Sequence, residues 1–341
     1  MKMLKVTAAT AGLALLASQA MAQSSVESFY KGKQMDLVIG YSAGGGYDTY
    51  ARLVARYLGQ FVPGQPNIVA RNMPGGGSRV AAGFVFKVAP KDGTVLATAD
   101  QSLSLAQAIG DKGIQFDTTK FIYIGNPSAE NNTTVTWHTT GIKTIEDATR
   151  QEVPMGATGG STSSQYPRAM NALLGTKFKI ILGYPGGNDI NLAMEKGEVA
   201  GRGSNSWASW KSTRPDWVRD KKINILVQIG LTKAPDLQDV PLLLDLAKND
   251  SDRAVLRMLS APATIGRPIF TTPGVPEDRV RALRAAFEKM IVDPGFVDEA
   301  KKTNLEIDPV SGEELQKIVN EIVNTPKETA ERLAAIIGEL Q

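Results

Sequence analysis

The stretch MDLVIGYSAGGGYDTYARLVARYLG, residues 35–59, decides the fold class. Residues 35–39 are a short, mostly apolar run typical of a strand, and residues 41–46 are a glycine-rich loop. Residues 48–59 repeat apolar side chains at the spacing of an amphipathic helix. Similar strand, loop and helix patterns alternate along the rest of the chain, which predicts an α/β fold with mainly parallel sheets.

Length and composition describe an ordinary globular protein. The 341 residues suggest about two domains, and a composition of 42% hydrophobic and 21% charged residues argues against disorder. The chain has no cysteine and a single histidine, His138, for which we expect a structural or surface role. These counts exclude disulfides, thiolate chemistry and a multi-histidine metal site. We therefore expect no metal and no cofactor, and much enzyme chemistry is already excluded.

Residues 1–22 have the three-part pattern of a secretory signal peptide. Lys2 and Lys5 precede an uncharged, mostly apolar stretch that is too short to span a bilayer, and Ala20 and Ala22 provide the small residues of a cleavage site. We predict cleavage after Ala22 and export. Loss of the two lysines lowers the formal net charge from +3 to +1, so the charge gives no reason to expect nucleic-acid or membrane-surface binding.

Two glycine-rich loops each lie between a predicted strand and a predicted helix. The first spans residues 41–48, and the second, GATGGSTSS, spans residues 156–164. In open parallel sheets, ligands bind beyond the carboxyl ends of the strands, where the unpaired N–H groups of helix N-termini attract anions. Either loop alone could equally be a structural turn or a polar surface loop. Two such loops, one in each half, favour a cleft that binds a carboxylate.

An ordered set of short motifs resembles the substrate-binding proteins of tripartite tricarboxylate transporters. The set extends over essentially the whole chain that follows the signal peptide, and its order is more specific than any single member. It comprises SAGGGYD (42–48), VARNMPGGG (69–77), APKDGTVL (89–96), GYPGG (183–187), KGEV (196–199), APDLQDVP (234–241), TPGVP (272–276) and DP (293–294).

The resemblance implies a type 2-like periplasmic binding protein, with two α/β domains of mainly parallel sheets around a ligand cleft. It implies a monomeric receptor, not an enzyme, that binds a small dicarboxylate, tricarboxylate or aromatic acid in the periplasm and delivers it to a membrane permease. We expect a discontinuous domain 1 of residues 23–126 and 261–341, with residues 127–260 as domain 2.

The resemblance also assigns ligand contacts, with two departures from the family's usual pattern. Ser42 stands where the family commonly has proline, and residues 200–210, AGRGSNSWASW, are polar where the family is apolar. That segment is equally a cleft wall, with Trp207 as its apolar face, or a rigid surface loop. After the third strand we rank Gln101 and Ser102 above Asp100, because a carboxylate repels an anion. The predicted ligand-binding residues are Tyr41, Ser42, Ala43, Gly44, Gly45, Asp48, Gln101, Ser102, Thr158, Gly159, Gly160, Ser161, Thr162, Arg202, Ser204 and Asn205.

Two other functions stay open at this point. An exported serine hydrolase would have to use His138 as its base, and the chain has no Gly-x-Ser-x-Gly motif. A sensor that presents its ligand-bound state to a signalling partner would use the same cleft.

Overall fold

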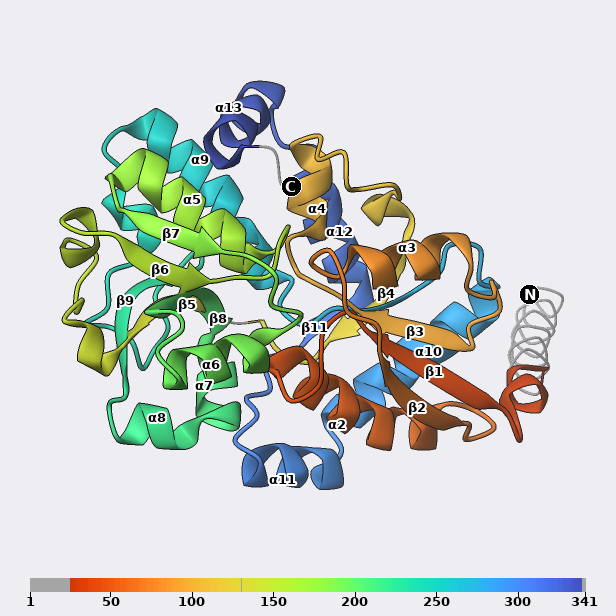
Figure 1. The fold of residues 1–341 in the computed structure, drawn as a ribbon. Helices are drawn as coiled ribbons and strands as arrows, with labels where there is room; N and C mark the ends of the chain where they lie inside the picture. Colours follow the sequence, from red (N-terminus) through yellow and green to blue (C-terminus); the bar gives the residue numbers. More distant parts are fainter. Residues whose placement is uncertain (1–24, 130, 339–341) are drawn as a thin grey trace, which may run out of the picture.

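Two β-sheets, each flanked by helices, lie side by side in the computed structural model (Figure 1). The structure describes residues 25–129 and 131–338, so the predicted signal peptide, residues 1–22 with cleavage after Ala22, lies outside the described residues. None of the helices in the described ranges is both long and apolar enough to cross a membrane.

The first sheet has the strand order β11-β4-β10-β3-β1-β2. Strand β1 runs parallel to β2 and β3, whereas β10 runs antiparallel to β3 and β4, and β11 antiparallel to β4. The strands are β1 (Gln34–Ile39), β2 (Asn67–Asn72), β3 (Val95–Thr98), β4 (Ile122–Asn126), β10 (Ile269–Thr271) and β11 (Val310–Ser311).

The second sheet has the order β7-β6-β8-β5-β9. Strands β6, β7 and β8 are parallel, and β5 runs antiparallel to β8 and β9. The strands are β5 (Asn132–Trp137), β6 (Val153–Gly156), β7 (Phe178–Ile181), β8 (Gly201–Ser206) and β9 (Ile223–Ile229). The predicted α/β fold of mostly parallel sheets is confirmed.

Helices cover both faces of the first sheet, which explains why the last three residues of β1, Leu37–Ile39, are all apolar and buried. Leu37 and Val38, which point to opposite faces, are both buried and belong to separate core clusters. The helices are α2 (Gly46–Phe61), α3 (Arg79–Lys87), α4 (Leu103–Ala108), α5 (Thr162–Leu174), α6 (Gly187–Glu195), α7 (Trp207–Thr213), α8 (Pro215–Arg219), α9 (Asp250–Ser260), α10 (Glu277–Ile291), α11 (Pro294–Lys302), α12 (Gly312–Val323) and α13 (Lys327–Ile337).

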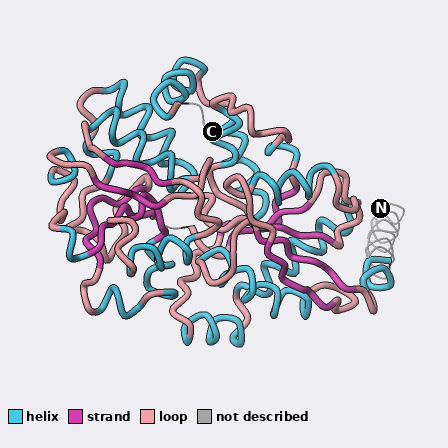
Figure 2. Tube along the Cα trace, viewed as in Figure 1, coloured by secondary structure: helices cyan, strands magenta, loops and turns pink. Residues whose placement is uncertain are grey.

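The chain passes from the first sheet to the second after β4 and returns before β10. The two crossing segments are joined by Asn126, whose side-chain oxygen accepts the backbone N–H groups of Ser128 (3.1 Å) and Arg267 (2.8 Å). Gly266 has φ +59°, and a Cβ atom there would lie 2.0 Å from the carbonyl oxygen of Ser128, so only glycine fits this close approach. Loops gather between the two groups of strands, as Figure 2 shows.

The C-terminal helix does not follow the predicted domain division. Residues 261–341 were assigned to domain 1, but α13 packs against α5 and α9, which flank the second sheet (Figure 1). Helix α12, in contrast, packs on β4 and α4 of the first sheet. The remaining boundaries, residues 23–126 and 127–260, stay a prediction.

Candidate functional site

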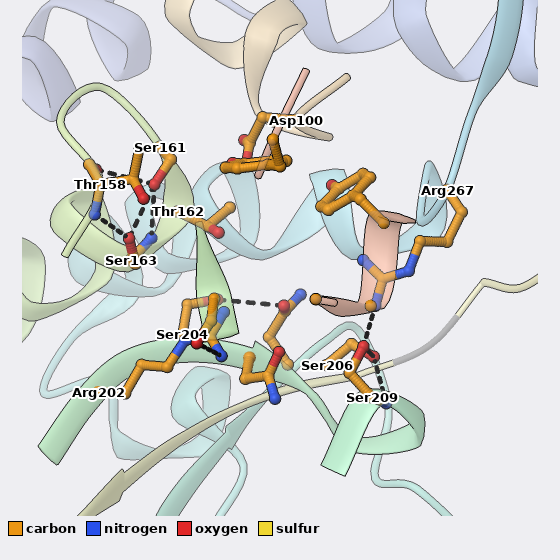
Figure 3. A pocket seen from close by; sticks show the side chains of 17 residues that line it. Asp100, Thr158, Ser161, Thr162, Ser163, Arg202, Ser204, Ser206, Ser209 and Arg267 are labelled. Carbon is orange, nitrogen blue, oxygen red and sulfur yellow. Dashed lines mark hydrogen bonds between the residues drawn. The ribbon is translucent and has the colours of Figure 1, made fainter. Parts of the chain in front are cut away.

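A narrow polar cavity of about 40 Å³ lies between the two sheets and is lined by residues of both halves (Figure 3). Its lining consists mostly of polar side chains and glycines, which suits a polar ligand.

Three helices of eight or more residues begin at the cavity. Gly45 and Gly46 at the start of α2, Thr162 at the start of α5 and Gly187 at the start of α6 all line it. The residues that precede α2 and α6 are Gly45 and Gly186, which have no side chain to cap the first N–H groups of these helices. Exposed N–H groups and the helix dipole both favour an anion at this place.

A buried guanidinium adds a full positive charge. Nη1 of Arg202 donates to the carbonyl oxygen of Gly187 (3.3 Å) and to Oδ1 of Asn191 (3.2 Å), both neutral acceptors. Burial lowers the pKa of Arg202 from its usual value, and the positive charges of Arg267 and Arg214 lower it further. A bound anion would offset this loss of hydration.

Arg267 reaches the cavity from the returning crossing segment. Its guanidinium lies over the ring of Tyr47 at 4.5 Å, and Nη2 donates to Oγ of Ser209 (2.5 Å) in the other half. The backbone N–H of the same residue is held by Asn126. Arg267 therefore contacts the cavity, the crossing segment and both halves.

Asp100 also lines the cavity, but its carboxylate is occupied by neighbouring donors. Tyr41 donates its phenol to Oδ2, and Ser102 donates its hydroxyl and its backbone N–H (2.9 Å) to Oδ1. Burial and the nearby carboxylate raise the pKa of Tyr41 well above its usual value, so the phenol stays protonated. These hydrogen bonds reduce the repulsion that Asp100 would exert on an anion.

A β-bulge in β8 directs consecutive polar residues into the cavity. The register runs from Asn205 opposite Thr133 to Arg202 opposite Val135, so β8 contains one more residue than β5 in this interval. An ordinary strand would alternate its side chains between two faces, whereas a bulge re-aims them. Arg202, Ser204, Asn205 and Ser206 all line the cavity as a result.

The two halves touch on both sides of the cavity. Ser42 donates from its hydroxyl to Asp189 of α6 (2.6 Å), and Arg79 donates to the carbonyl oxygen of Gly160 (2.7 Å). Lys211 of α7 forms an ion pair with Glu306. The structure is thus a closed arrangement of the two halves around the cavity.

Several solved proteins share this architecture. The periplasmic binding protein BugD superposes with a TM-score of 0.71 at 18% identity, covering 91% of this chain and 99% of BugD. MatC from Rhodopseudomonas palustris with bound malate gives 0.68 at 18% identity, covering 90% and 99%. An R. palustris protein with adipate gives 0.69 at 18% identity, covering 90% and 98%. The chain has the fold of the Bug- and TctC-type periplasmic binding proteins.

Sequence comparison agrees with the fold. The "UPF0065 protein in gbd 5′ region" of Cupriavidus necator is 25% identical over 337 residues, which cover 96% of this chain and 95% of the relative. No family model matches the sequence. The resemblance inferred from the ordered motifs is confirmed, and the solved neighbours of this fold are binding proteins rather than enzymes.

The cavity of this Bug- and TctC-type fold brings together half of the predicted ligand residues. They come from the first loop, the second loop and β8, and the bulge explains why the last group reaches the cavity. The predicted residues that line it are Tyr41, Gly45, Thr158, Ser161, Thr162, Arg202, Ser204 and Asn205.

The other predicted residues do not line the cavity, and several of them form hydrogen bonds that hold the surrounding loops and helices in place. Asp48 accepts from Gly44 and Arg52 and so organises the first loop, while Ser42 bonds α6. Gly160 bonds Arg79, and Ser102 bonds Asp100. The predicted residues outside the cavity lining are Ser42, Ala43, Gly44, Asp48, Gln101, Ser102, Gly159 and Gly160.

Gln101 and Ser102, which we rank above Asp100 as ligand contacts, do not line the cavity, whereas Asp100 does. The backbone N–H of Gln101 bonds the hydroxyl of Tyr47 (2.9 Å), and its side chain lies beside Tyr166. Asp100 takes the lining position because Tyr41 and Ser102 satisfy its carboxylate. Trp207 does not line this cavity: its Nε1 donates to Asp236 (2.7 Å), and both residues line a second cavity.

Sequence reasoning missed the lining residues that come from distant segments. Ser163 and Tyr47 adjoin predicted residues and could have been found from the helix starts alone. Asn132 and Arg267 carried no local signal, because the chain crossings alone bring them to the cavity. The missed lining residues are Gly46, Tyr47, Asp100, Asn132, Ser163, Gly187, Ser206, Ser209 and Arg267.

His138 is exposed and does not line the cavity. In the part of the chain that the structure describes, no cluster of three or more His, Cys, Asp or Glu side chains could hold a metal ion.

Proposed function

We propose that this protein is a periplasmic solute-binding receptor that closes around a small organic carboxylate and delivers it to a tripartite tricarboxylate-type permease. It is exported by the signal peptide of residues 1–22, acts as a monomer and catalyses no reaction. The ligand is a dicarboxylate, a tricarboxylate or an aromatic acid, and the compact cavity favours the smaller acids.

One observation carries the proposal: uncapped N-termini of α2 and α6 and the guanidinium of Arg202 meet in one cavity between the two halves. Backbone N–H groups from both halves can bond the same carboxylate only when the halves are together. Ligand contacts made only in the closed form shift the population toward it. The solved neighbours with malate and adipate support a carboxylate as ligand.

The serine hydrolase alternative is not favoured. The cavity is rich in serine, but a triad needs a histidine base within hydrogen-bond reach of the nucleophile. The chain's single histidine, His138, is exposed on a turn after β5 and lines no part of the cavity.

A thermal-shift screen against mono-, di- and tricarboxylic and aromatic acids, followed by calorimetry, tests the proposal. A ligand that binds only the folded state stabilises it by about 2.7 kcal/mol at a concentration of 100 times Kd. We expect at least one small acid to raise the melting temperature and the corresponding neutral amide to fail. A screen in which no acid shifts the melting temperature would overturn the proposal.

A further inference from the structure

Arg267 is fixed to the crossing segments and to the first half. Its backbone N–H donates to the side chain of Asn126 in the other crossing segment (2.8 Å). Its guanidinium carbon lies 4.5 Å from the ring centre of Tyr47 and 5.5 Å from that of Tyr50, both in α2. A cation is attracted to an aromatic face, and Tyr47 also donates its hydroxyl to the carbonyl oxygen of Gly266 (3.3 Å). We therefore expect Arg267 to move with α2 when the two halves move.

The same guanidinium has a hydrogen-bond acceptor in the second half. Nη2 of Arg267 donates to Oγ of Ser209 in α7 (2.5 Å), a bond drawn as a dashed line in Figure 3. The hydroxyl of Ser206 also donates to Oγ of Ser209 (3.2 Å), and the N–H of Ser209 donates to Oγ of Ser206 (3.1 Å), which holds the acceptor in place. Ser209 is fully buried and Arg267 is only 4% exposed. The contact is a buried hydrogen bond with a charged donor.

The packing around this bond shows that it depends on closure. A Cβ atom at Gly46, the first residue of α2, would lie 1.9 Å from Oγ of Ser209 and 3.0 Å from Nη2 of Arg267. Not even a methyl group fits between the start of α2 and α7. Opening of the cavity separates α2 from α7, and Arg267, which stays on α2, then exchanges the hydroxyl of Ser209 for water.

We propose that Arg267 is a positioning residue for closure: its bond to Ser209 stabilises the closed form and raises the affinity for every ligand by one common factor. The inference rests on the proposed function, because it concerns closure around the proposed carboxylate. Stabilising the binding-competent form multiplies the affinity by the gain in its population, whichever acid is bound. Arg267 therefore sets how tightly acids are held, while other lining residues set which acids are held.

A double-mutant cycle tests this role by calorimetry with succinate, citrate and benzoate, which represent the three classes of acid. We expect Arg267→Met and Ser209→Ala each to weaken every acid that binds by one factor on the order of 10–100, the range for hydrogen bonds to charged groups. The double variant should be no more than a few-fold weaker than Arg267→Met, because both changes remove the same bond. If Ser209 instead contacted the ligand directly, its loss would persist beside Arg267→Met and would differ between acids.

Ser212→Ala is the matched control on the same helix. Its hydroxyl donates only to carbonyl oxygens of α7, those of Ala208 (2.9 Å) and Ser209 (3.4 Å), and it does not line the cavity. Ser212→Ala should keep the affinity for each acid. Melting temperatures report whether each variant folds, and a role in stability alone would lower them without coupling the two positions in acid affinity.

A distance measurement tests closure itself. Because the chain has no cysteine, spin labels can be attached to cysteines introduced at two exposed positions, Gln60 in α2 and Glu195 in α6. At saturating succinate, citrate or benzoate, the labelled Arg267→Met and Ser209→Ala chains should show more of the longer, open distance than the labelled chain without these changes. If Arg267→Met does not fold, Ser209→Ala alone decides this test.

Three results would overturn the role of Arg267 and leave the receptor function standing. They are losses that differ between acids, losses that multiply in the double variant, and an open fraction that neither variant changes. A chain that binds no acid of the wider screen would overturn the receptor function itself.

Discussion

Replacing Gly46 by alanine should weaken ligand binding by obstructing closure. Gly46 is the first residue of α2 and lines the cavity. A Cβ atom there would lie 1.9 Å from Oγ and 2.9 Å from Cβ of Ser209, and 3.0 Å from Nη2 of Arg267. Ser209 belongs to α7 in the opposite half, so the collision arises only when the two halves are together.

The size of the affinity loss depends on how far the side chain of Ser209 can move away from the new methyl group. Carbon atoms in contact prefer about 3.5–4.0 Å, so the Cβ atom of Ser209 must withdraw by roughly 0.6 Å or more. Rotating the hydroxyl does not relieve that contact, and it breaks the bonds from Arg267 (2.5 Å) and Ser206 (3.2 Å). Overpacking of this kind costs about 1–3 kcal/mol, which corresponds to about a 5- to 150-fold loss of affinity.

The neighbouring glycine provides the matched control. A Cβ atom at Gly45 would meet the backbone nitrogen of Gly187 at 3.6 Å, an ordinary contact. Gly45→Ala should therefore change the affinity for a given acid, measured by calorimetry, by much less than Gly46→Ala. Neither residue has a positive φ, so alanine strains neither backbone. Unchanged affinity in Gly46→Ala, or an equal loss in both variants, would refute the reasoning.

Other positions test the walls of the site. Gly203→Ala should lower the free energy of unfolding by about 1–3 kcal/mol, because its Cβ atom would lie 2.2 Å from Pro167. The control Gly83→Ala in α3, where a Cβ atom would have nothing within 4 Å, should raise the free energy of unfolding slightly. Equal melting temperatures of the two variants would contradict this prediction. Burial alone would raise the pKa of Asp48, but hydrogen bonds from Arg52, Gly44 and Asn72 lower it below its ordinary 3.8. Asp48 therefore stabilises the fold above pH 3.8 and loses this effect as the pH falls through the lowered pKa, so Asp48→Asn should cost about 2 kcal/mol at pH 7 in urea melts and nothing in strong acid. Arg79→Met removes the bond to Gly160 across the two halves and should speed ligand release several-fold in stopped-flow measurements; an unchanged release rate would show that this contact does not hold the closed form.

Local patterns in the sequence were sufficient for the fold and for the two loops. The apolar run of β1 and the glycines after it predict a strand that ends at a helix start, and α2 begins at Gly46, two residues before the predicted position. Ser161 caps α5 by accepting the N–H of Ser163 (3.3 Å), as its place before a helix suggests. These features depend on neighbouring residues, which a single sequence displays.

The side of each loop that faces the ligand could not be predicted in the same way. Ser42, Gly44 and Gly45 belong to the same loop, yet only Gly45 lines the cavity. The hydroxyl of Ser42 instead donates to Asp189 of α6, and a Cβ atom at Gly44 would lie 3.3 Å from the side chain of Asn188. Their positions depend on how the second half packs against the loop. The position of Arg267 was still harder to predict from the sequence. Its backbone N–H donates to the side chain of Asn126, which lies 141 residues away in the sequence, and this hydrogen bond fixes Arg267 beside the cavity.

The same long-range packing explains why we expect the cavity to bind an anion. The starts of α2, α5 and α6 approach one another only when the halves meet, and each brings about half a positive charge at its N-terminus. Arg202 adds a full charge whose hydrogen bonds reach only neutral oxygens, while Asp100, the one acidic side chain among the described lining residues, is already bonded to Tyr41 and Ser102. Closure without a ligand would gather this positive potential in one cavity between the halves. A carboxylate there would convert that repulsion into attraction, so we expect the negative charge of the ligand to couple binding to closure.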